Sequence, residues 1–426
     1  MQRSPIPVWR TTAEAEAVLA PLLELPAVRR LREAAAGREL HLVGGTLRDR
    51  LLGRPHRDID AVVAGGGASV ADRLATALGA RVVPLGHEAL VSYRVARQDL
   101  IVDLWDRGDL PLARDLARRD VTINALALDV ASGRLLDPLG GLADLADGRL
   151  RIPAPQVLDD DPTRVLRLVR LAAELDGFEP TAETLDAARA RSARLAGIPG
   201  ERVRHELEII LGTVPALASF ELLCELEIHP TLLLGQAPAG ARARGRRAFA
   251  RSDALIAGDG ERGVAGDPLL LHWALLLSPL QPEPASAAVE RLRRLRYMGR
   301  RIARQWASVT ARAGLPDDRR AQRWFLHGLG SLWPTAALVA ASLSADLTLD
   351  ECRSRLRRLA ELAETEGERL FDPAPLLSAD EVMRLTGLEP GPELGRALEG
   401  LRRGQVDGDL ATPEDARRWL AGPTPR

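Results

Sequence analysis

The stretch that decides the fold runs from Leu42 to Ala64 and reads Leu-Val-Gly-Gly-Thr-Leu-Arg-Asp-Arg-Leu-Leu-Gly-Arg-Pro-His-Arg-Asp-Ile-Asp-Ala-Val-Val-Ala. Its second half predicts a buried strand, because the apolar run 61–63 directly follows Asp58-Ile59-Asp60. Residues two apart on a strand face the same side, so Asp58 and Asp60 are expected to project together. Two such carboxylates repel each other and have little structural use without a cation. The pattern therefore predicts a Mg²⁺ site, since Mg²⁺ is usually held by one or two carboxylates plus substrate phosphates.

The first half of the stretch predicts a phosphate-binding turn. Gly44 and Gly45 carry no side chains, so the backbone can approach a triphosphate closely. The helix that follows presents its N-terminus to the phosphate, and Arg48 adds charge-assisted hydrogen bonds one turn later. A glycine pair or an Asp-x-Asp alone is common in turns and caps, but their combination with a strand and a short helix is specific.

In these residues the chain resembles the polymerase-beta nucleotidyltransferase superfamily. More narrowly, it resembles the class II tRNA nucleotidyltransferases (CCA-adding enzymes) and the bacterial poly(A) polymerases. The resemblance implies an α/β nucleotidyltransferase head, with a mixed polymerase-beta-like sheet, followed by an elongated all-helical neck, body and tail. It also implies two Mg²⁺ ions at Asp58 and Asp60, with CTP and ATP as substrates bound in part by Gly45 and Arg48. A two-metal site can activate an attacking hydroxyl and stabilise a leaving pyrophosphate.

A second motif, Arg-Arg-Asp-Val-Thr-Ile-Asn-Ala, occupies residues 118–125. Taken alone, its arginines fit a solvated helix end and Asp120 fits a helix N-cap. The run nevertheless matches the family's Arg-Arg-Asp-x-x-x-Asn-Ala motif. The resemblance implies that Arg119 contacts the nucleotide, while Asp120 and Asn124 hold the loop and the ribose.

The third motif is Asp-Asp-Pro-Thr-Arg-Val-Leu-Arg-Leu-Val-Arg at residues 160–170. Asp161 followed by proline predicts a helix start, and Arg164, Arg167 and Arg170 are spaced to form a stripe along that helix. The run resembles the family's Glu-Asp-x-x-Arg motif, with Asp160 where the family usually has Glu. The resemblance implies that Asp161 and Arg164 read the base edge, and that Arg167 and Arg170 contact triphosphate or base. A carboxylate acceptor suits the exocyclic amines of cytosine and adenine.

A third catalytic carboxylate is expected on a neighbouring strand. Asp103 is the best candidate, because it lies within the apolar run 100–104, where an unpaired charge is costly. The helix motif around Gly200-Glu201-Arg202-Val203 and Glu206 is expected to supply a structural ion-pair network.

Length and composition bound the class of protein. The chain has 426 residues, of which 46% are hydrophobic and 27% charged, so it can form two or more domains with buried cores. A net charge of −1 excludes a generally basic nucleic-acid binder, so any RNA contact needs a local patch. No membrane-length apolar run, signal-peptide pattern or metal-spaced cysteine pair is evident, and the two cysteines fit a reducing cytoplasm. No protein partner and no membrane partner is indicated.

Strand signals dominate to about Ile152, and helical periodicity dominates after Pro155, where the strands are expected to stop. We expect five regions: a helical extension at 1–37, the head at 38–155, a nucleotide-reading neck at 156–230, a helical body at 231–372 and a helical tail at 373–426. The run 291–304 is expected to be an arginine-dense helix. A solvated face and a tRNA phosphate contact are equally good interpretations of Arg293, Arg294, Arg300 and Arg301 within it.

The sequence thus predicts an enzyme that transfers nucleotides from CTP or ATP to the 3′ end of tRNA without a template. Complete CCA addition is the leading hypothesis, with addition of C alone, addition of A alone and poly(A) synthesis as alternatives. A more distant alternative is a non-catalytic RNA-binding protein whose nucleotidyltransferase head has lost its catalytic activity. The joint presence of Asp58, Asp60, Arg119, Asp161 and Arg164 favours the enzyme.

Overall fold

The computed structural model describes residues 11–55, 58–87, 90–97, 100–228, 239–258, 264–278, 282–310 and 314–422. It divides into two compact units, which are described separately. The first comprises Met1–Glu206 with Glu225–Ile228, and the second comprises Leu207–Cys224 with His229–Arg426. The boundary expected at residue 230 lies outside the described residues.

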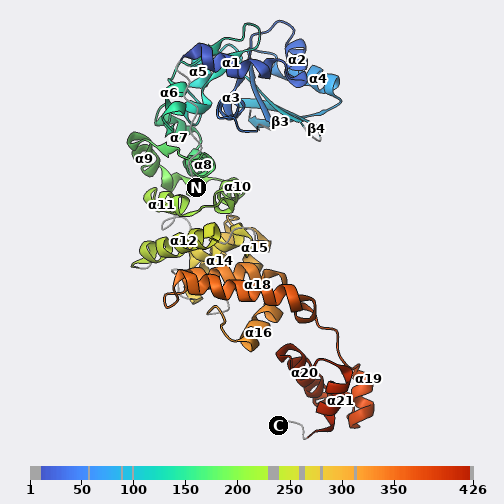
Figure 1. Cartoon of the computed structure of the whole chain (residues 1–426). Helices are drawn as coiled ribbons and strands as arrows, with labels where there is room; N and C mark the ends of the chain where they lie inside the picture. The colour runs from blue at the N-terminus through green and yellow to red at the C-terminus, as the bar shows by residue number, and fades with distance from the viewer. Residues whose placement is uncertain are drawn as a thin grey trace. The chain divides into compact units, whose positions relative to one another are not determined.

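The first unit is built around a mixed sheet (Figure 1). Its seven strands lie in the order β3-β4-β5-β2-β1-β6-β7. All neighbouring strands are antiparallel except β2 and β5, which are parallel. The strands are β1 (Leu40–Val43), β2 (Asp58–Val63), β3 (Arg81–His87), β4 (Leu90–Arg97), β5 (Leu100–Asp106), β6 (Ala127–Asp129) and β7 (Leu135–Leu136).

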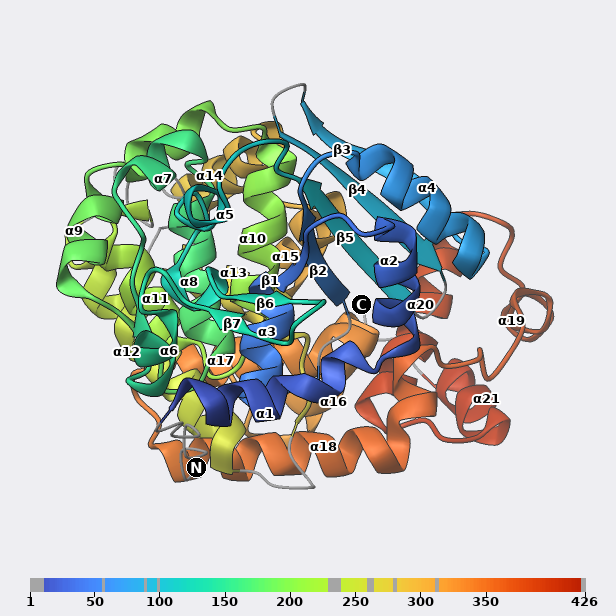
Figure 2. The same cartoon turned by 90° about the horizontal axis from the view of Figure 1, so that it is seen from above.

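Helices cover this sheet because their apolar faces need burial. Helix α4 (Gly67–Leu78) buries Val70, Ala71 and Leu74 and packs across β4 and β5, and Figure 2 shows it beside these strands. Helix α2 (Pro26–Ala35) packs on α4, and α1 (Thr12–Leu23) packs on α3 (Gly44–Leu51). The apolar end of β2 is fully buried, as the sequence predicts, which leaves its polar start at the margin of the core.

The rest of the first unit is mainly helical. Its further elements are α5 (Leu112–Leu116), η1 (Thr122–Asn124), α6 (Gly141–Ala146), β8 (Arg149–Leu150), α7 (Gln156–Asp160), α8 (Arg164–Glu174), β9 (Glu179–Pro180), α9 (Ala182–Arg189), η2 (Ser192–Gly197) and the start of α10 (Gly200–Gly212).

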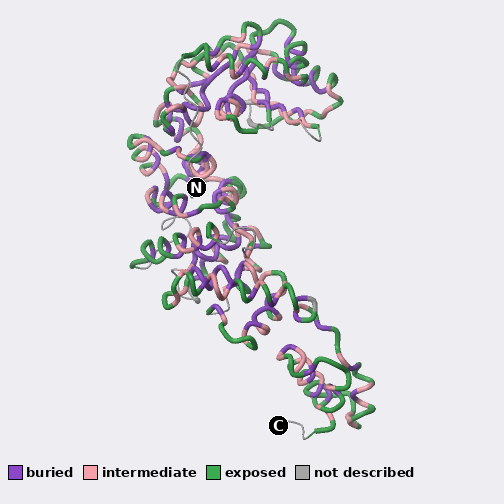
Figure 3. The backbone as a smooth tube through the Cα atoms, viewed as in Figure 1, coloured by how far each residue is buried: buried purple, intermediate pink, exposed green. Residues whose placement is uncertain are grey.

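The second unit is all-helical in its described residues. Its helices are α11 (Leu217–Glu225), α12 (Ala241–Gly258), α13 (Pro268–Leu277), α14 (Pro282–Arg294), α15 (Arg300–Thr310), α16 (Arg319–Leu329), η5 (Gly330–Leu332), α17 (Trp333–Leu343), α18 (Leu349–Phe371), α19 (Ala379–Thr386), α20 (Pro392–Asp407) and α21 (Pro413–Ala421). The predicted α/β head with a helical remainder is thus confirmed. Figure 3 shows buried residues within the sheet and within these helices.

One helical stretch, Arg319–Leu343, is long and apolar enough to cross a membrane by length and composition. It is not a single straight helix, because η5 interrupts it at Gly330, whose φ is +50°. Its C-terminal part, α17, packs against α12, α13 and α15, and eight of its eleven residues are buried. This contact pattern is that of a core helix.

Three local expectations are wrong. The strands do not stop at Pro155, because Glu179–Pro180 pairs in parallel with Arg149–Leu150. The run 291–304 is not one helix: α14 ends at Arg294 and α15 begins at Arg300, with Arg296 at a φ of +60° between them. Burial of Tyr297 and Met298 accompanies that turn and offsets the lost helical bonds.

The third correction concerns Asp161, which is not the residue that directly precedes its helix. It is the C-cap of α7, and Thr163 is the N-cap of α8. The Asp161 carboxylate accepts hydrogen bonds from the Thr163 amide (3.1 Å) and hydroxyl (2.6 Å), so its capping bonds stabilise the turn before α8.

Candidate active site

The start of β2 is fixed against the glycine turn by short polar contacts. The Thr46 hydroxyl donates to the Asp58 carbonyl oxygen at 3.1 Å and accepts the Asp60 amide at 2.7 Å. The Gly45 amide donates to Asp60 Oδ2 at 3.0 Å. These bonds hold the Asp60 carboxylate beside the backbone that the sequence predicts for phosphate binding, while Asp58 is exposed.

Gly44 permits this close approach. Its φ is +69°, a conformation that costs residues with a Cβ about 1–2 kcal/mol. A Cβ added there would lie 2.8 Å from Asp60 Oδ2 and 3.3 Å from Arg119 Nη1. The turn therefore requires glycine both for its backbone conformation and for the space beside Asp60.

Negative charge accumulates around Asp60. The parallel register of β2 and β5 pairs Asp60 with Asp103. Burial is the main cause that raises the pKa of Asp60 to about 6; Asp103 raises it further, and Arg119 opposes the rise. A buried carboxylate whose pKa is raised in this way is a hard oxygen donor that fits a divalent cation.

The number of protein ligands for such a cation is small. In the described part of the chain, no group of three or more His, Cys, Asp or Glu residues is arranged to hold a metal ion. Asp58 and Asp60 would therefore leave several coordination positions to phosphate oxygens and water, as is usual for Mg²⁺.

Asp103 lies where the sequence predicts it, on the strand next to the Asp pair, and it is buried. Both of its oxygens accept hydrogen bonds from Arg94 on β4, at 2.8 and 2.7 Å. Arg94 escaped the sequence analysis because no motif marks it. Arg94 could have been identified only from the antiparallel register of β4 and β5, which pairs it with Asp103.

The second motif forms a hydrogen-bonded chain across the first unit. Arg48 Nη1 donates to Asn124 Oδ1 at 2.8 Å, and Asn124 Nδ2 donates to Asp120 Oδ1 at 3.0 Å. Asp120 Oδ2 accepts from Arg167 Nη1 at 3.5 Å. Burial opposes ionisation of Asp120, but Arg167 and the Asn124 amide outweigh it and hold the pKa of Asp120 below its usual value.

Arg119 is a second charged neighbour of Asp60. Its guanidinium stacks over the Trp105 ring, 5.4 Å from the centroid, and lies 3.5 Å from the Asp115 carboxylate. Its Nε is buried without a hydrogen-bond partner among the described residues. A buried, unsatisfied cationic donor of this kind is suited to an anionic ligand.

The arginine stripe of α8 faces carboxylates in the structure. Glu206, on α10 and buried, lies 3.6 Å from Arg167 Nε and 3.3 Å from Arg170 Nη1. Arg164 donates to the Val157 carbonyl at 2.9 Å. The expected ion-pair network around Glu206 is thus present, and it continues the chain that begins at Arg48.

Asp161 and Arg164 border this network. Arg202 donates to both Asp161 oxygens, at 3.0 and 2.8 Å. Burial opposes ionisation of Asp161, but Thr163 and Arg202 outweigh it and lower the pKa of Asp161. A cavity of about 270 Å³ adjoins them, lined by Thr163, Arg167, Glu201, Arg202, His205 and Glu206.

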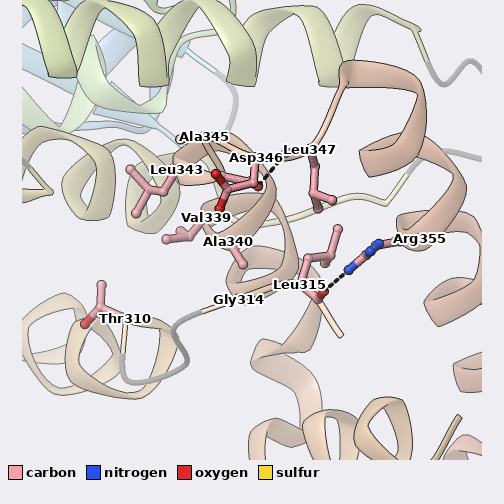
Figure 4. Close-up of a pocket in the computed structure, with 11 residues that line it drawn as sticks. Thr310, Gly314, Leu315, Val339, Ala340, Leu343, Ala345, Asp346, Leu347 and Arg355 are labelled. Carbon is pink, nitrogen blue, oxygen red and sulfur yellow. Dashed lines mark hydrogen bonds between the residues drawn. The ribbon is translucent and has the colours of Figure 1, made fainter. Parts of the chain in front are cut away.

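The predicted RNA-contacting arginines are exposed and lie on two helices. Arg293 pairs with Glu290 at 2.9 Å and Arg301 with Asp267 at 3.4 Å, while Arg294 and Arg300 are exposed at adjoining helix ends. The second unit also holds a cavity of about 530 Å³ among α15, α17 and α18, where Arg355 donates to the Leu315 carbonyl (Figure 4). None of the predicted site residues lines that cavity.

Comparisons with known proteins identify relatives along most of the chain. Family models described as a poly A polymerase head domain and as a probable RNA and SrmB-binding site of polymerase A match residues 103–151 and 177–239. The CC-adding tRNA nucleotidyltransferase of Geobacter sulfurreducens is 32% identical over 408 residues, covering 89% of this chain and 90% of that protein. The A-adding tRNA nucleotidyltransferase of Deinococcus radiodurans is 32% identical over 417 residues, covering 89% and 94%.

Solved structures share the fold. The Thermotoga maritima CCA-adding enzyme, complexed with tRNA, matches with a TM-score of 0.70 and 20% identity, covering 97% of this chain and 98% of that chain. A CCA-adding enzyme complexed with CTP matches with a TM-score of 0.70 and 22% identity over the same shares.

Proposed function

The chain belongs to the family of bacterial tRNA nucleotidyltransferases and poly(A) polymerases, and on this premise we propose that it adds C and A from CTP and ATP to the 3′ end of tRNA. The observation that carries the proposal is the position of the Asp60 carboxylate, which accepts the Gly45 amide and lies near Asp103 and Arg119. A site with carboxylates, a glycine turn without side chains and a buried arginine can accept a nucleoside triphosphate together with its metal ions. We place the reaction in the cytoplasm.

Asp58 and Asp60 would hold Mg²⁺, two ions in the proposed reaction. When bound, these ions lower the pKa of the RNA 3′ hydroxyl and neutralise charge on the leaving pyrophosphate. The Gly44–Gly45 backbone makes room for the triphosphate, and Arg48 and Arg119 bind its oxygens. Asp120 and Asn124 fix Arg48 through the hydrogen-bonded chain and hold the ribose.

The base would be read in place of a template by Asp161 and Arg164. The Asp161 carboxylate accepts from an exocyclic amine, which cytosine and adenine carry and uracil lacks. Arg164 supplies donors for ring nitrogen or carbonyl acceptors. Arg167 and Arg170 lie on the same helix and assist base recognition, because Glu206 and Asp120 hold their guanidinium groups in place.

Transcripts of tRNA that lack one, two or three terminal nucleotides test the proposal. The purified protein is incubated with each transcript and with CTP, ATP or both, in the presence of Mg²⁺. We expect extension by the missing nucleotides and no further. Extension that stops after two C residues, or that occurs only on transcripts ending in CC, assigns the protein to C-only or A-only addition.

Long adenylate tails would instead identify a poly(A) polymerase. Specific tRNA binding without incorporation of any nucleotide, by protein shown to be folded by circular dichroism, would overturn the proposal in favour of a non-catalytic RNA-binding role.

A further inference from the structure

Three charged residues form one row across the sheet beside the proposed metal site. Arg94 on β4 is paired in register with Asp103 on β5, and Asp103 is paired in register with Asp60 on β2. Residues at one register position of neighbouring strands have side chains on the same face, with Cβ atoms about 4.5–5.5 Å apart. From β4 to β2, the side chains in this row therefore carry one positive charge followed by two negative charges.

The middle residue of the row has both oxygens engaged. Arg94 Nε donates to Asp103 Oδ1 at 2.8 Å, and Arg94 Nη2 donates to Oδ2 at 2.7 Å. The Asp103 side chain is 13% exposed and the Arg94 side chain 42% exposed, so the guanidinium covers the carboxylate from the solvent side. A bidentate fork fixes a carboxylate firmly and sets a positive charge against it, which opposes the approach of a cation.

Asp60 is not shielded in this way. Its Oδ2 atom accepts the Gly45 amide, and Arg119 is a nearby cation that makes no bidentate fork with it among the described contacts. Two neighbouring carboxylates on one face thus differ in availability: that of Asp60 is open to a cation, and that of Asp103 is neutralised by a side chain of the protein.

We propose that Arg94 is a positioning residue that keeps Asp103 paired and out of the metal coordination shell, so that Asp58 and Asp60 alone supply the carboxylate ligands. The inference rests on the proposed function and deepens it. With two carboxylates rather than three, more coordination positions remain for triphosphate oxygens, and the metal ion binds weakly enough to enter and leave with the nucleotide.

Binding of Mn²⁺ to the nucleotide-free full-length protein tests the inference without using activity as the readout. Free Mn²⁺ is followed by electron paramagnetic resonance in wild type, Arg94→Gln and the double variant Arg94→Gln/Asp103→Asn. Release of Asp103 should tighten Mn²⁺ binding in Arg94→Gln by about tenfold, the size of effect typical for residues around a metal site. The double variant removes the released carboxylate and should return to near the wild-type affinity.

Two controls make the result interpretable. Asp60→Asn should abolish this Mn²⁺ binding, which shows that the titrated site is the proposed one; absence of Mn²⁺ binding in wild type would count against the proposed function itself. Arg81→Gln makes the same charge change on the exposed outer strand β3 and should leave the affinity unchanged.

Weaker or unchanged Mn²⁺ binding in folded Arg94→Gln would overturn the inference, because an arginine that orients a true ligand loses affinity when it is removed. Should that variant fail to fold, Arg94→Lys decides the question. Lysine keeps the charge but cannot form the planar fork, so we expect binding about threefold tighter than wild type, and no tightening would contradict the proposal.

Discussion

At the scale of single residues, the two carboxylates that we propose as metal ligands have different surroundings. Asp58 is exposed, whereas Asp60 is held by the Gly45 amide and lies next to Asp103. We predict that Asp58→Ala and Asp60→Ala each abolish nucleotide transfer while tRNA binding largely survives. Loss of a metal ligand removes several kcal/mol of transition-state stabilisation, about a thousandfold or more in rate.

Single-turnover incorporation of labelled CTP, together with tRNA binding by filter retention, measures both effects. Asp72→Ala is a matched control, because Asp72 is an exposed carboxylate on α4, away from the proposed site. Near-wild-type transfer by either site variant would refute the assignment of these two residues as metal ligands.

Choice among nucleotides is also a matter of single residues. We predict that Asp161→Ala or Arg164→Ala lowers discrimination against UTP and GTP more than it lowers the rate with the preferred nucleotide. Each lost base contact is worth about 1–3 kcal/mol of discrimination. The measurement is kcat/KM for all four triphosphates on one tRNA transcript.

Asp161 also has a structural role, which the experiment must separate from its proposed role in base recognition. It bonds to Thr163 and pairs with Arg202, so Asp161→Ala should also lower the stability by about 1 kcal/mol. Arg202→Gln removes the ion pair but keeps the carboxylate, and it should lower the melting temperature with less effect on discrimination. If UTP and GTP stay rejected as strongly as before in folded Asp161→Ala and Arg164→Ala, these residues do not read the base.

At the scale of elements, α3, η1, α8 and α10 are joined by one polar network. The chain runs from Arg48 through Asn124, Asp120 and Arg167 to Glu206. Because Glu206 is buried between Arg167 and Arg170, Glu206→Gln leaves two guanidinium groups without a full counter-charge. Removing one partner of a buried ion pair is destabilising, because it leaves the remaining charge uncompensated.

We therefore predict that Glu206→Gln lowers the melting temperature and raises the KM for CTP and ATP, with a smaller change in kcat. The reason is that α8 loses the contact that orients its arginines, while Asp58 and Asp60 are untouched. Thermal unfolding and steady-state kinetics are compared with those of Glu179→Gln, an exposed position on β9. A normal KM in a destabilised Glu206→Gln protein would limit the network to a structural role.

The elements also show what the sequence could predict. The strand that carries Asp58 and Asp60 was predictable because its apolar end is continuous and its polar start is short. The break between α14 and α15 was not, since it depends on Arg296 adopting a positive φ while Tyr297 and Met298 turn into the core. Arg94 was equally hidden, because its importance comes from strand pairing and not from its neighbours in the chain. The motif roles of Arg119, Asn124 and Asp161 remain predictions, although the structure gives each a defined set of contacts.

At the scale of the whole molecule, the net charge of −1 means that tRNA must be attracted by local positive surface. The second unit offers exposed arginines at the adjoining ends of α14 and α15. Exposed ion pairs such as Arg293–Glu290 are worth little in water, so they can be exchanged for phosphate contacts at small cost. Phosphate contacts carry no sequence information, but they release counterions and make binding strongly salt-dependent.

We predict that changing Arg293, Arg294, Arg300 and Arg301 to Gln weakens tRNA binding and flattens its dependence on salt. If all four contact phosphates, the slope of log affinity against log salt should fall by about three. Activity at saturating tRNA should change little, because the proposed chemistry uses residues of the first unit only.

A matched variant with Arg29, Arg30, Arg32 and Arg81 changed to Gln alters the net charge equally on exposed positions of the first unit. An equal loss of slope in both variants would mean that total charge, and not this surface, attracts tRNA. An unchanged slope in the variant of Arg293, Arg294, Arg300 and Arg301 would show that these arginines only face solvent and do not contact tRNA.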